Sequence, residues 1–266
     1  AAEALVSGSW EPGVHPVPDA IEREVASLKL AALRDGYVSI VKSVINSRTT
    51  AYEYEYPFHG AKLRYPKTAE PAQSIEPISS ERLNEIFRIG VGRGLLDEAM
   101  LPLLGLLTSR RLGLLVNLQG NDIREKYPGV WVAQTGGIKL MHDGTWRRIP
   151  IKTDASTTFF VLHDFLREIG FTEWARSRGD DFLFAELTRL TDPSKSASQY
   201  MRRLFRRAGV TSSGKEVFHS LRGTGIEQMR DSKVDARDRK LQAGHQLESE
   251  HDLYGFKAIS EVRARE

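Results

Sequence analysis

Residues 218–224 of this chain, Phe218-His219-Ser220-Leu221-Arg222-Gly223-Thr224, decide how the fold is interpreted. Apolar and small residues at helical spacing predict a helix over 219–231. On such a helix His219 and Arg222 are three positions apart on one face, so both side chains can reach one ligand. The same pair also occurs by chance, and an isolated arginine is more often a surface residue. The residues that flank this helix therefore decide what the pair means.

Two further groups of residues flank the helix. Downstream lies Gly244-His245, and Tyr254 follows nine residues after that histidine. Far upstream, the step Thr108-Ser109 is followed by Arg110 and Arg111 and then by an apolar run. Each group is weak by itself, because a lone tyrosine usually packs in a core and a Gly-His step is common. Their order along the chain is the informative feature.

The pattern of apolar residues around these groups predicts a mostly helical domain. Ser79 is placed as the N-cap of one helix, with an acidic residue in its first turn. Residues 129–151 instead alternate with period two, and Asp143-Gly144 predicts a hairpin turn in one small antiparallel sheet. Further helices are predicted over 95–107, with a kink at Pro102, and over 157–169, 196–208 and 235–255.

The first part of the chain differs from the rest. Residues 1–18 carry glycines and prolines and are predicted to be an irregular lead-in, whereas 19–34 and 38–45 show helical spacing. Two short helices bury too little apolar surface for a complete domain, and prolines mark 55–75 as a linker. We therefore expect an α+β fold, mainly α with a small antiparallel β-sheet. Its two expected parts are residues 1–75 and residues 76–266.

The composition excludes several classes of protein. The chain has 266 residues, 27% of them charged and 40% hydrophobic, which is ordinary for a folded protein. Cysteine is absent, so disulfides, Cys-ligated zinc, iron–sulfur clusters and a cysteine nucleophile are excluded. No apolar run approaches the ~18 residues of a spanning helix, and the first residues lack a signal-peptide pattern. We expect a soluble, intracellular protein.

One segment departs from the balanced charge of the chain. The net charge is +3 overall, but residues 200–240 hold eleven basic and five acidic side chains. Such a cluster is typical of a surface that binds a polyanion, although a solvated helix face is an equally acceptable interpretation. The candidate DNA-binding residues in this segment are Arg202, Arg203, Arg206, Arg207 and Lys215.

Taken in order, these groups resemble the tyrosine recombinase (phage integrase) family. The resemblance covers roughly residues 76–255, and residues 37–58 are similar to the tail of the family's core-binding domain. It implies that 1–75 is a partial core-binding, DNA-clamping region with a linker, and that 76–266 is the catalytic domain. The catalytic residues that it implies are Arg111, Lys139, His219, Arg222, His245 and the nucleophile Tyr254.

The chain departs from the family's pattern at several positions. Leu114 stands where the family commonly has an acidic residue, three positions after the first arginine, and its side chain cannot form hydrogen bonds. Arg110 competes with Arg111 for the place of that arginine. His142 lies nearer than Lys139 to the usual place of the family's lysine, measured from Pro150.

The residue types suit cleavage of a phosphodiester. Attack by an oxygen adds negative charge to the nonbridging oxygens, and two arginines supply rigid cationic forks for them. The two histidines can donate hydrogen bonds to the same oxygens or accept the proton of the nucleophile. A tyrosine has a pKa of about 10, so its attack needs a cationic site, a base or both. Lys139 is the candidate acid for the leaving 5′-oxygen. No metal ion or other cofactor is expected, because the arginines take that role.

The resemblance implies a site-specific recombinase (integrase), which joins Tyr254 to a DNA 3′-phosphate, frees a 5′-hydroxyl and then reseals the DNA. The implied partners are double-stranded DNA with paired recombination half-sites, a homotetramer on that DNA and an accessory DNA-bending protein. No membrane is involved, and the implied location is the cytoplasm of a bacterial host, on DNA. Two alternatives stay open: a type IB topoisomerase-like enzyme, and a catalytically impaired DNA-binding protein of the same fold.

Overall fold

The computed structural model describes residues 39–55, 76–149, 151, 154–210, 217–247 and 258–266. The chain divides into two compact units, Ala1–Ser74 and Ile75–Glu266. In the first unit the structure describes one helix, α3 (Ser39–Ala51), which confirms the helical spacing seen over 38–45. The helix predicted over 19–34 lies outside the described residues.

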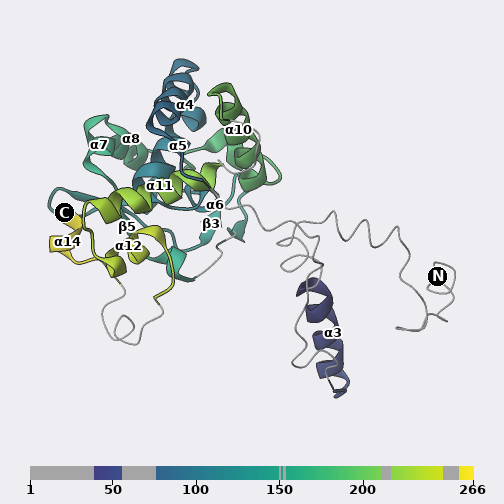
Figure 1. Ribbon diagram of the computed structural model, residues 1–266. Helices are drawn as coiled ribbons and strands as arrows, with labels where there is room; N and C mark the ends of the chain where they lie inside the picture. The colour runs from purple at the N-terminus through teal and green to yellow at the C-terminus, as the bar shows by residue number, and fades with distance from the viewer. Residues whose placement is uncertain (1–38, 56–75, 150, 152–153, 211–216, 248–257) are drawn as a thin grey trace. The chain divides into compact units, whose positions relative to one another are not determined.

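In the second unit, one helix at the upper edge packs against another in the middle (Figure 1). Helix α4 (Ser80–Gly92) begins where predicted, because the Ser79 side chain accepts a hydrogen bond from the Arg82 amide. Helix α5 (Leu96–Thr108) continues through Pro102 as one element and is buried along most of its length. It packs against α4 and against α11 (Phe218–Asp231), so the helix of residues 218–224 lies on the core of the unit.

The strands form two sheets where one was expected. Strands β1 (Ile123–Tyr127), β2 (Val130–Ala133) and β5 (Phe160–Val161) make an antiparallel sheet in the order β1-β2-β5. Strands β3 (Ile138–Leu140) and β4 (Trp146–Arg148) form a separate hairpin around the predicted Asp143-Gly144 turn. The helix predicted over 157–169 is therefore wrong in its first half, because a short continuous apolar run fits a buried strand as well as a helix.

The remaining elements are helices, most of them short except α10. They are α6 (Leu112–Leu115), η2 (Gly120–Asp122), η3 (Asp154–Thr157), α7 (Asp164–Glu168), α8 (Phe171–Ser177), α9 (Ala185–Thr188), α10 (Pro193–Arg207), α12 (Ala236–Ala243) and α14 (Glu261–Arg265). Helix α12 ends at Ala243, because Gly244 has a left-handed backbone with φ of 70°. Residues 248–255 of the predicted span 235–255 lie outside the described residues. None of the described helices is long and apolar enough to cross a membrane.

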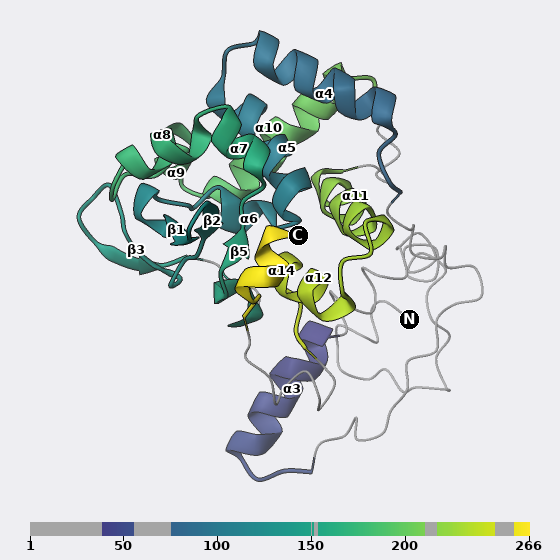
Figure 2. The same ribbon diagram turned by 90° about the vertical axis from the view of Figure 1, so that its left-hand side faces the viewer.

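The core has a large and a small cluster. The large cluster lies between α4, α5, α10 and α11 and the three-stranded sheet, and it includes the fully buried Leu101, Leu104 and Leu204. The small cluster joins Val132 and Phe159 to Leu241 of α12 and to Ile259 near the end of the chain. Figure 2 shows α14 beside α12 and β5 on this side of the unit. The mainly α architecture with small antiparallel sheets is confirmed.

Candidate functional site

Two glycines place the helix that carries His219 and Arg222. A Cβ atom at Gly105 of α5 would lie 2.6 Å from the Phe218 ring, and one at Gly225 of α11 would lie 2.3 Å from the Leu106 carbonyl oxygen. Both distances are too short for any larger residue. Gly105 leaves room for the Phe218 ring, and Gly225 lets the backbones of the two helices approach closely. This crossing brings Arg222 next to the turn that follows α5, where Ser109 lies.

Arg222 is held rigidly in the interior. Its side chain is 2% exposed, and its Nη1 donates hydrogen bonds to the Ser109 carbonyl at 2.9 Å and to the Ala243 carbonyl at 2.6 Å. Its Nη2 is also buried, and within the described residues it has no hydrogen-bond partner. A fixed guanidinium with a spare buried donor is suited to bind an anion, since an unmet buried donor is costly.

The neighbouring arginines Arg110 and Arg111 have different environments. Arg110 is 1% exposed and donates to the Leu241 carbonyl at 2.8 Å, while its guanidinium lies 4.5 Å from the Phe160 ring centre. Arg111 is only half-buried, and its Nη1 donates one hydrogen bond to the Ser156 hydroxyl at 3.2 Å. Of the two, Arg111 keeps more donors available, which favours it over Arg110 as a ligand of an anion.

The two histidines stand near the same cations. His219 and His245 are both exposed, at the start of α11 and just after Gly244. Desolvation and the positive charges of Arg222 and Arg111, with smaller effects of His219 and Arg110, lower the pKa of His245 to about 4. His245 is therefore neutral near pH 7 and can donate one hydrogen bond or accept a proton.

The cluster is strongly positive. Burial, followed by the charges of Arg222 and Arg111, lowers the pKa of Arg110 to about 9, and burial with Arg111 lowers the pKa of Arg222 to about 10. Among the described side chains, no carboxylate forms an ion pair with Arg110, Arg111 or Arg222. Like charges that repel each other and lack an acidic partner favour an incoming anion. Leu114 is buried in the core and supplies no polar group.

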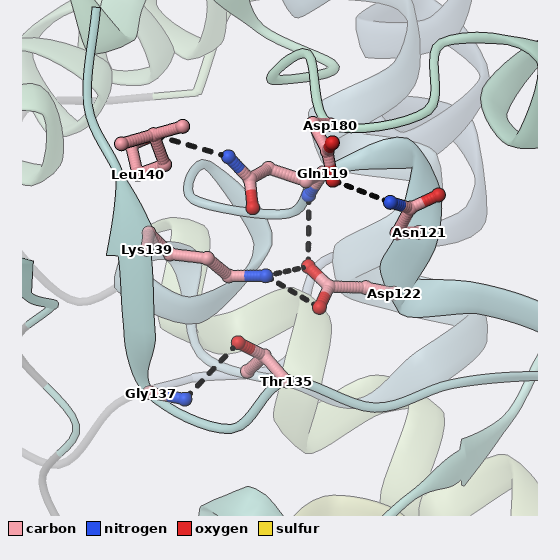
Figure 3. A network of polar contacts seen from close by, with 8 residues as sticks. All are labelled: Gln119, Asn121, Asp122, Thr135, Gly137, Lys139, Leu140 and Asp180. Carbon is pink, nitrogen blue, oxygen red and sulfur yellow. Dashed lines mark hydrogen bonds and ion pairs between the residues drawn. The ribbon is translucent and has the colours of Figure 1, made fainter. Parts of the chain in front are cut away.

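Lys139, the candidate acid, is paired with a buried carboxylate. It lies on β3 with 5% exposure, and its Nζ forms an ion pair with both carboxylate oxygens of Asp122 (Figure 3). The Asp122 carboxylate also accepts a hydrogen bond from the backbone N–H of Gln119 at 2.8 Å. The side-chain amide of Gln119 donates to the Leu140 carbonyl at 3.3 Å. These bonds fasten the β3–β4 hairpin to the turn at η2. His142 instead bonds the Thr188 hydroxyl at 2.9 Å.

The candidate DNA-binding arginines of α10 divide into two pairs. Arg202 and Arg206 are exposed and make no ion pair with described residues. Arg203 lies 4.3 Å from the Tyr200 ring centre, and Arg207 forms an ion pair with the buried Glu98 at 3.3 Å. Arg203 and Arg207 also line a cavity of about 690 Å³ beside α8 and α9.

Two predicted residues lie outside the described part of the chain: the proposed nucleophile Tyr254 and Lys215. The described part brings together Arg111, Arg222, His219 and His245, and it pairs Lys139 with Asp122. Ser156 and Asp122, the partners of Arg111 and Lys139, are not predicted from the sequence, because neither stands in a motif. The sequence also identifies Arg110 only as a competitor of Arg111.

Comparisons with known proteins give likenesses to solved structures only. No protein-family model and no curated protein matches the chain. The chain is similar to the structure of XerA recombinase, with 17% identity, a TM-score of 0.47, and 99% of this chain and 86% of that one covered.

Integrase structures give similar values. Residues 75–356 of lambda integrase, a dimer bound to a COC′ core site, match with 15% identity, a TM-score of 0.49, and 97% of this chain and 88% of that one covered. The integrase from mycobacterium phage Brujita matches with 12% identity, a TM-score of 0.40, and 93% and 82% covered. The solved structures that this chain resembles are thus recombinases and integrases, and at these identities the likeness concerns the fold alone.

Proposed function

We propose that the chain is a DNA strand transferase of the tyrosine recombinase type, which cleaves and rejoins DNA through a 3′-phosphotyrosyl intermediate. The observation that carries the proposal is the buried Nη2 of Arg222, an unmet donor within a cationic cluster where no described carboxylate forms an ion pair with an arginine. A phosphodiester supplies the negative charge that this cluster lacks. The charge grows during attack, so rigid donors stabilise the transition state more than the ground state.

The proposed roles follow from the contacts of each group. Arg222 and Arg111 bind the nonbridging oxygens of the scissile phosphate. His219 and His245 stand beside them, and the neutral ring of His245 donates a hydrogen bond or takes the phenol proton of Tyr254. The phenolate oxygen bonds to phosphorus, the bond to the 5′-oxygen breaks, and its electron pair leaves with that oxygen. A proton from Lys139 neutralises the 5′-oxygen, which requires the ammonium to leave Asp122.

The proposal extends to the rest of the chain. Residues 1–75 contribute a partial core-binding region and linker, and 76–266 form the catalytic domain. The α10 arginines and Lys215 bind the DNA backbone. The working assembly is a homotetramer on paired half-sites, helped by an accessory DNA-bending protein, on DNA in a bacterial host.

Covalent trapping on nicked DNA tests the reaction. A pool of nicked duplexes with randomised central sequences is incubated with the protein, and adducts that survive denaturant are recovered and mapped by peptide sequencing. We expect an adduct at Tyr254. Tyr254→Phe keeps DNA affinity and forms no adduct, because only the phenol oxygen is removed. An adduct of normal yield with this variant places the nucleophile elsewhere.

Relaxation of supercoiled plasmid, measured beside the trapping assay, separates the alternatives. A type IB topoisomerase-like enzyme relaxes supercoiled plasmid of any sequence, whereas a recombinase cleaves selected sequences. Two observations favour a catalytically impaired DNA-binding protein as the second candidate: Leu114 stands in place of the usual acid, and Asp122 holds Lys139. Such a protein binds DNA and gives neither an adduct nor relaxation.

A further inference from the structure

Arg110 joins three distant segments of the second unit. Its Nη2 donates to the Leu241 carbonyl at 2.8 Å, in the last turn of α12. Longer contacts of 3.5 Å reach the carbonyls of Ser156, Thr158 and Phe159, which lead from η3 into β5. One side chain therefore ties the segment before β5 to the end of α12.

This burial is unusual for an arginine. Its guanidinium is 1% exposed, yet within the described residues it has no carboxylate partner, and its Nε has no hydrogen-bond partner. Carbonyl dipoles, the face of Phe160 and the negative end of α12 replace the missing counter-ion. A buried cation is costly, and an apolar side chain of similar size fills such a space at lower cost. The cation thus calls for an explanation beyond packing.

We call Arg111, Arg222, His219 and His245 together the anion site. Arg110 contacts the residues that support two of them. A Cβ atom at Gly244 would lie 2.3 Å from Arg110 Nη1, so the guanidinium packs against the backbone that precedes His245. Ser156 is shared, because its carbonyl accepts from Arg110 and its hydroxyl from Arg111. Any displacement of Arg110 therefore moves the supports of both His245 and Arg111.

We propose that Arg110 is a positioning residue of the anion site, which fixes Arg111 and His245 in place and adds positive charge beneath them without touching the anion. The identity of the anion as a phosphodiester rests on the proposed function, whereas the positioning role does not. Arg110 thereby differs from Arg111, the phosphate ligand, although the two are adjacent in sequence.

The titration of His245, followed by NMR of its labelled ring, tests the positioning role without DNA. The charged groups that face this ring are Arg222 and His219 of α11 and Arg110 and Arg111 after α5. Wild type is compared with Arg110→Met, Arg110→Lys and the control Arg88→Met, which removes an exposed arginine of α4. His245→Gln assigns the signal, and circular dichroism verifies that each variant is folded.

We expect the pKa of His245 to rise above about 4 in Arg110→Met, by only part of the shift, because a nearby cation and a fixed backbone are lost while burial, Arg222 and Arg111 still lower it. Arg110→Lys keeps the charge but not the fork that reaches several carbonyls, so a smaller rise is expected there. The Arg88→Met control stays at the wild-type value. A wild-type His245 titration in both Arg110 variants overturns the proposal, and Arg110→Lys alone decides it if Arg110→Met does not fold.

Binding of inorganic phosphate, measured by calorimetry, is the second readout. Arg110→Met is expected to weaken it about tenfold through the lost charge, and Arg88→Met to leave it unchanged. Equal affinity in wild type and Arg110→Met contradicts the electrostatic part of the proposal. If wild type binds no phosphate but the His245 titration responds to Arg110, the proposed function fails and the positioning role stands.

Discussion

At the scale of single residues, the geometry of the site depends on one turn whose backbone conformation is energetically unfavourable for a residue other than glycine. Ser109 ends α5 with φ of 55°, a left-handed conformation that favours glycine, and its hydroxyl is buried without a partner among described residues. Its carbonyl nevertheless accepts the hydrogen bond from Arg222. The strain is thus located where the chain turns toward Arg110 and Arg111.

Ser109→Gly is expected to stabilise the protein by about 1 kcal/mol, because glycine adopts this conformation without strain. The Arg222 contact uses only the backbone and is preserved. Urea unfolding of the variant and of wild type measures the difference. A loss of stability would mean that the serine side chain contributes a contact of its own.

Arg222→Lys tests whether the fork geometry matters beyond charge. A lysine cannot bond the Ser109 and Ala243 carbonyls and still present a donor to the phosphate, so adduct formation is expected to fall by about 10²–10³-fold. DNA affinity, which depends on many backbone contacts, changes little. Single-turnover trapping and a filter-binding assay separate the two quantities. A variant that cleaves at the normal rate removes Arg222 from the site.

The lowered pKa of His245 implies that the stability of the protein depends on pH. Its pKa is lowered to about 4 in the folded protein from an unperturbed 6.5, so between these values the unfolded chain binds more protons. Stability is therefore expected to rise with pH across this window and to be lost as the pH falls from 6.5 toward 4. His245→Gln flattens the dependence. Unfolding curves from pH 4 to pH 7 in phosphate-free buffer, for both proteins, provide the measurement.

At the scale of elements, the β3–β4 hairpin is attached to η2 by a buried ion pair. Burial raises the pKa of Asp122, which the nearby Lys139 and the Gln119 amide oppose. The ion pair between Lys139 and Asp122 has to be broken whenever Lys139 moves to another anion. Fastening the hairpin and donating a proton are alternative uses of the same ammonium group.

Removal of one partner of this pair is expected to be strongly destabilising. Lys139→Met leaves a buried carboxylate, at a cost of about 3–5 kcal/mol, whereas the double variant Asp122→Asn/Lys139→Met recovers much of it. The control is Arg147→Met on the same hairpin, which breaks the exposed ion pair with Asp143 at about 0–1 kcal/mol. Urea unfolding provides all the values. Equal losses in Lys139→Met and Arg147→Met would show that the ion pair does not hold the hairpin.

Helix α10 offers a comparison between its two pairs of arginines. Arg202→Ala and Arg206→Ala are each expected to reduce the slope of log affinity for DNA against log salt by about 1, since each removes one phosphate contact. Arg207→Ala is expected to reduce stability instead, because among the described residues the buried Glu98 then keeps only Arg93 as an ion-pair partner. Salt titrations with one duplex check the slopes. Unchanged slopes would assign Arg202 and Arg206 to a solvated face.

At the scale of the whole molecule, the sequence predicts the elements with strong local signals. Ser79 and the apolar spacing after it identify α4, the apolar run identifies α5, and Asp143-Gly144 identifies the β3–β4 hairpin. Strand β5 is missed because its apolar run has no distinctive period. The predictions of α4, α5 and the β3–β4 hairpin are confirmed because each signal lies within a few neighbouring residues.

The candidate site is predictable only in part. Order along the chain identifies Arg111, His219, Arg222 and His245, which the structure places within electrostatic reach of one another. The burial of Arg110 and the pairing of Lys139 with Asp122 depend on tertiary contacts, and charged residues are usually exposed. Spacing along the chain favours Arg111 over Arg110, but it does not predict which of the two is buried. Their contacts with Ser156 and Leu241 show that only after folding.

The arginine contacts of the site also have a consequence for biosynthesis. The hydrogen bonds from Arg110 to Ser156, from Arg222 to Ser109 and from Arg110 to Leu241 join residues 46, 113 and 131 positions apart. Closing such long loops costs entropy that local helices do not incur, so these contacts form late. A nascent chain that has left the ribosome only as far as α10 has most of its core helices but lacks α12 and Arg222, and so has no complete anion site. The growing polypeptide therefore cannot bind an anion through this site until α11 and α12 have been synthesised.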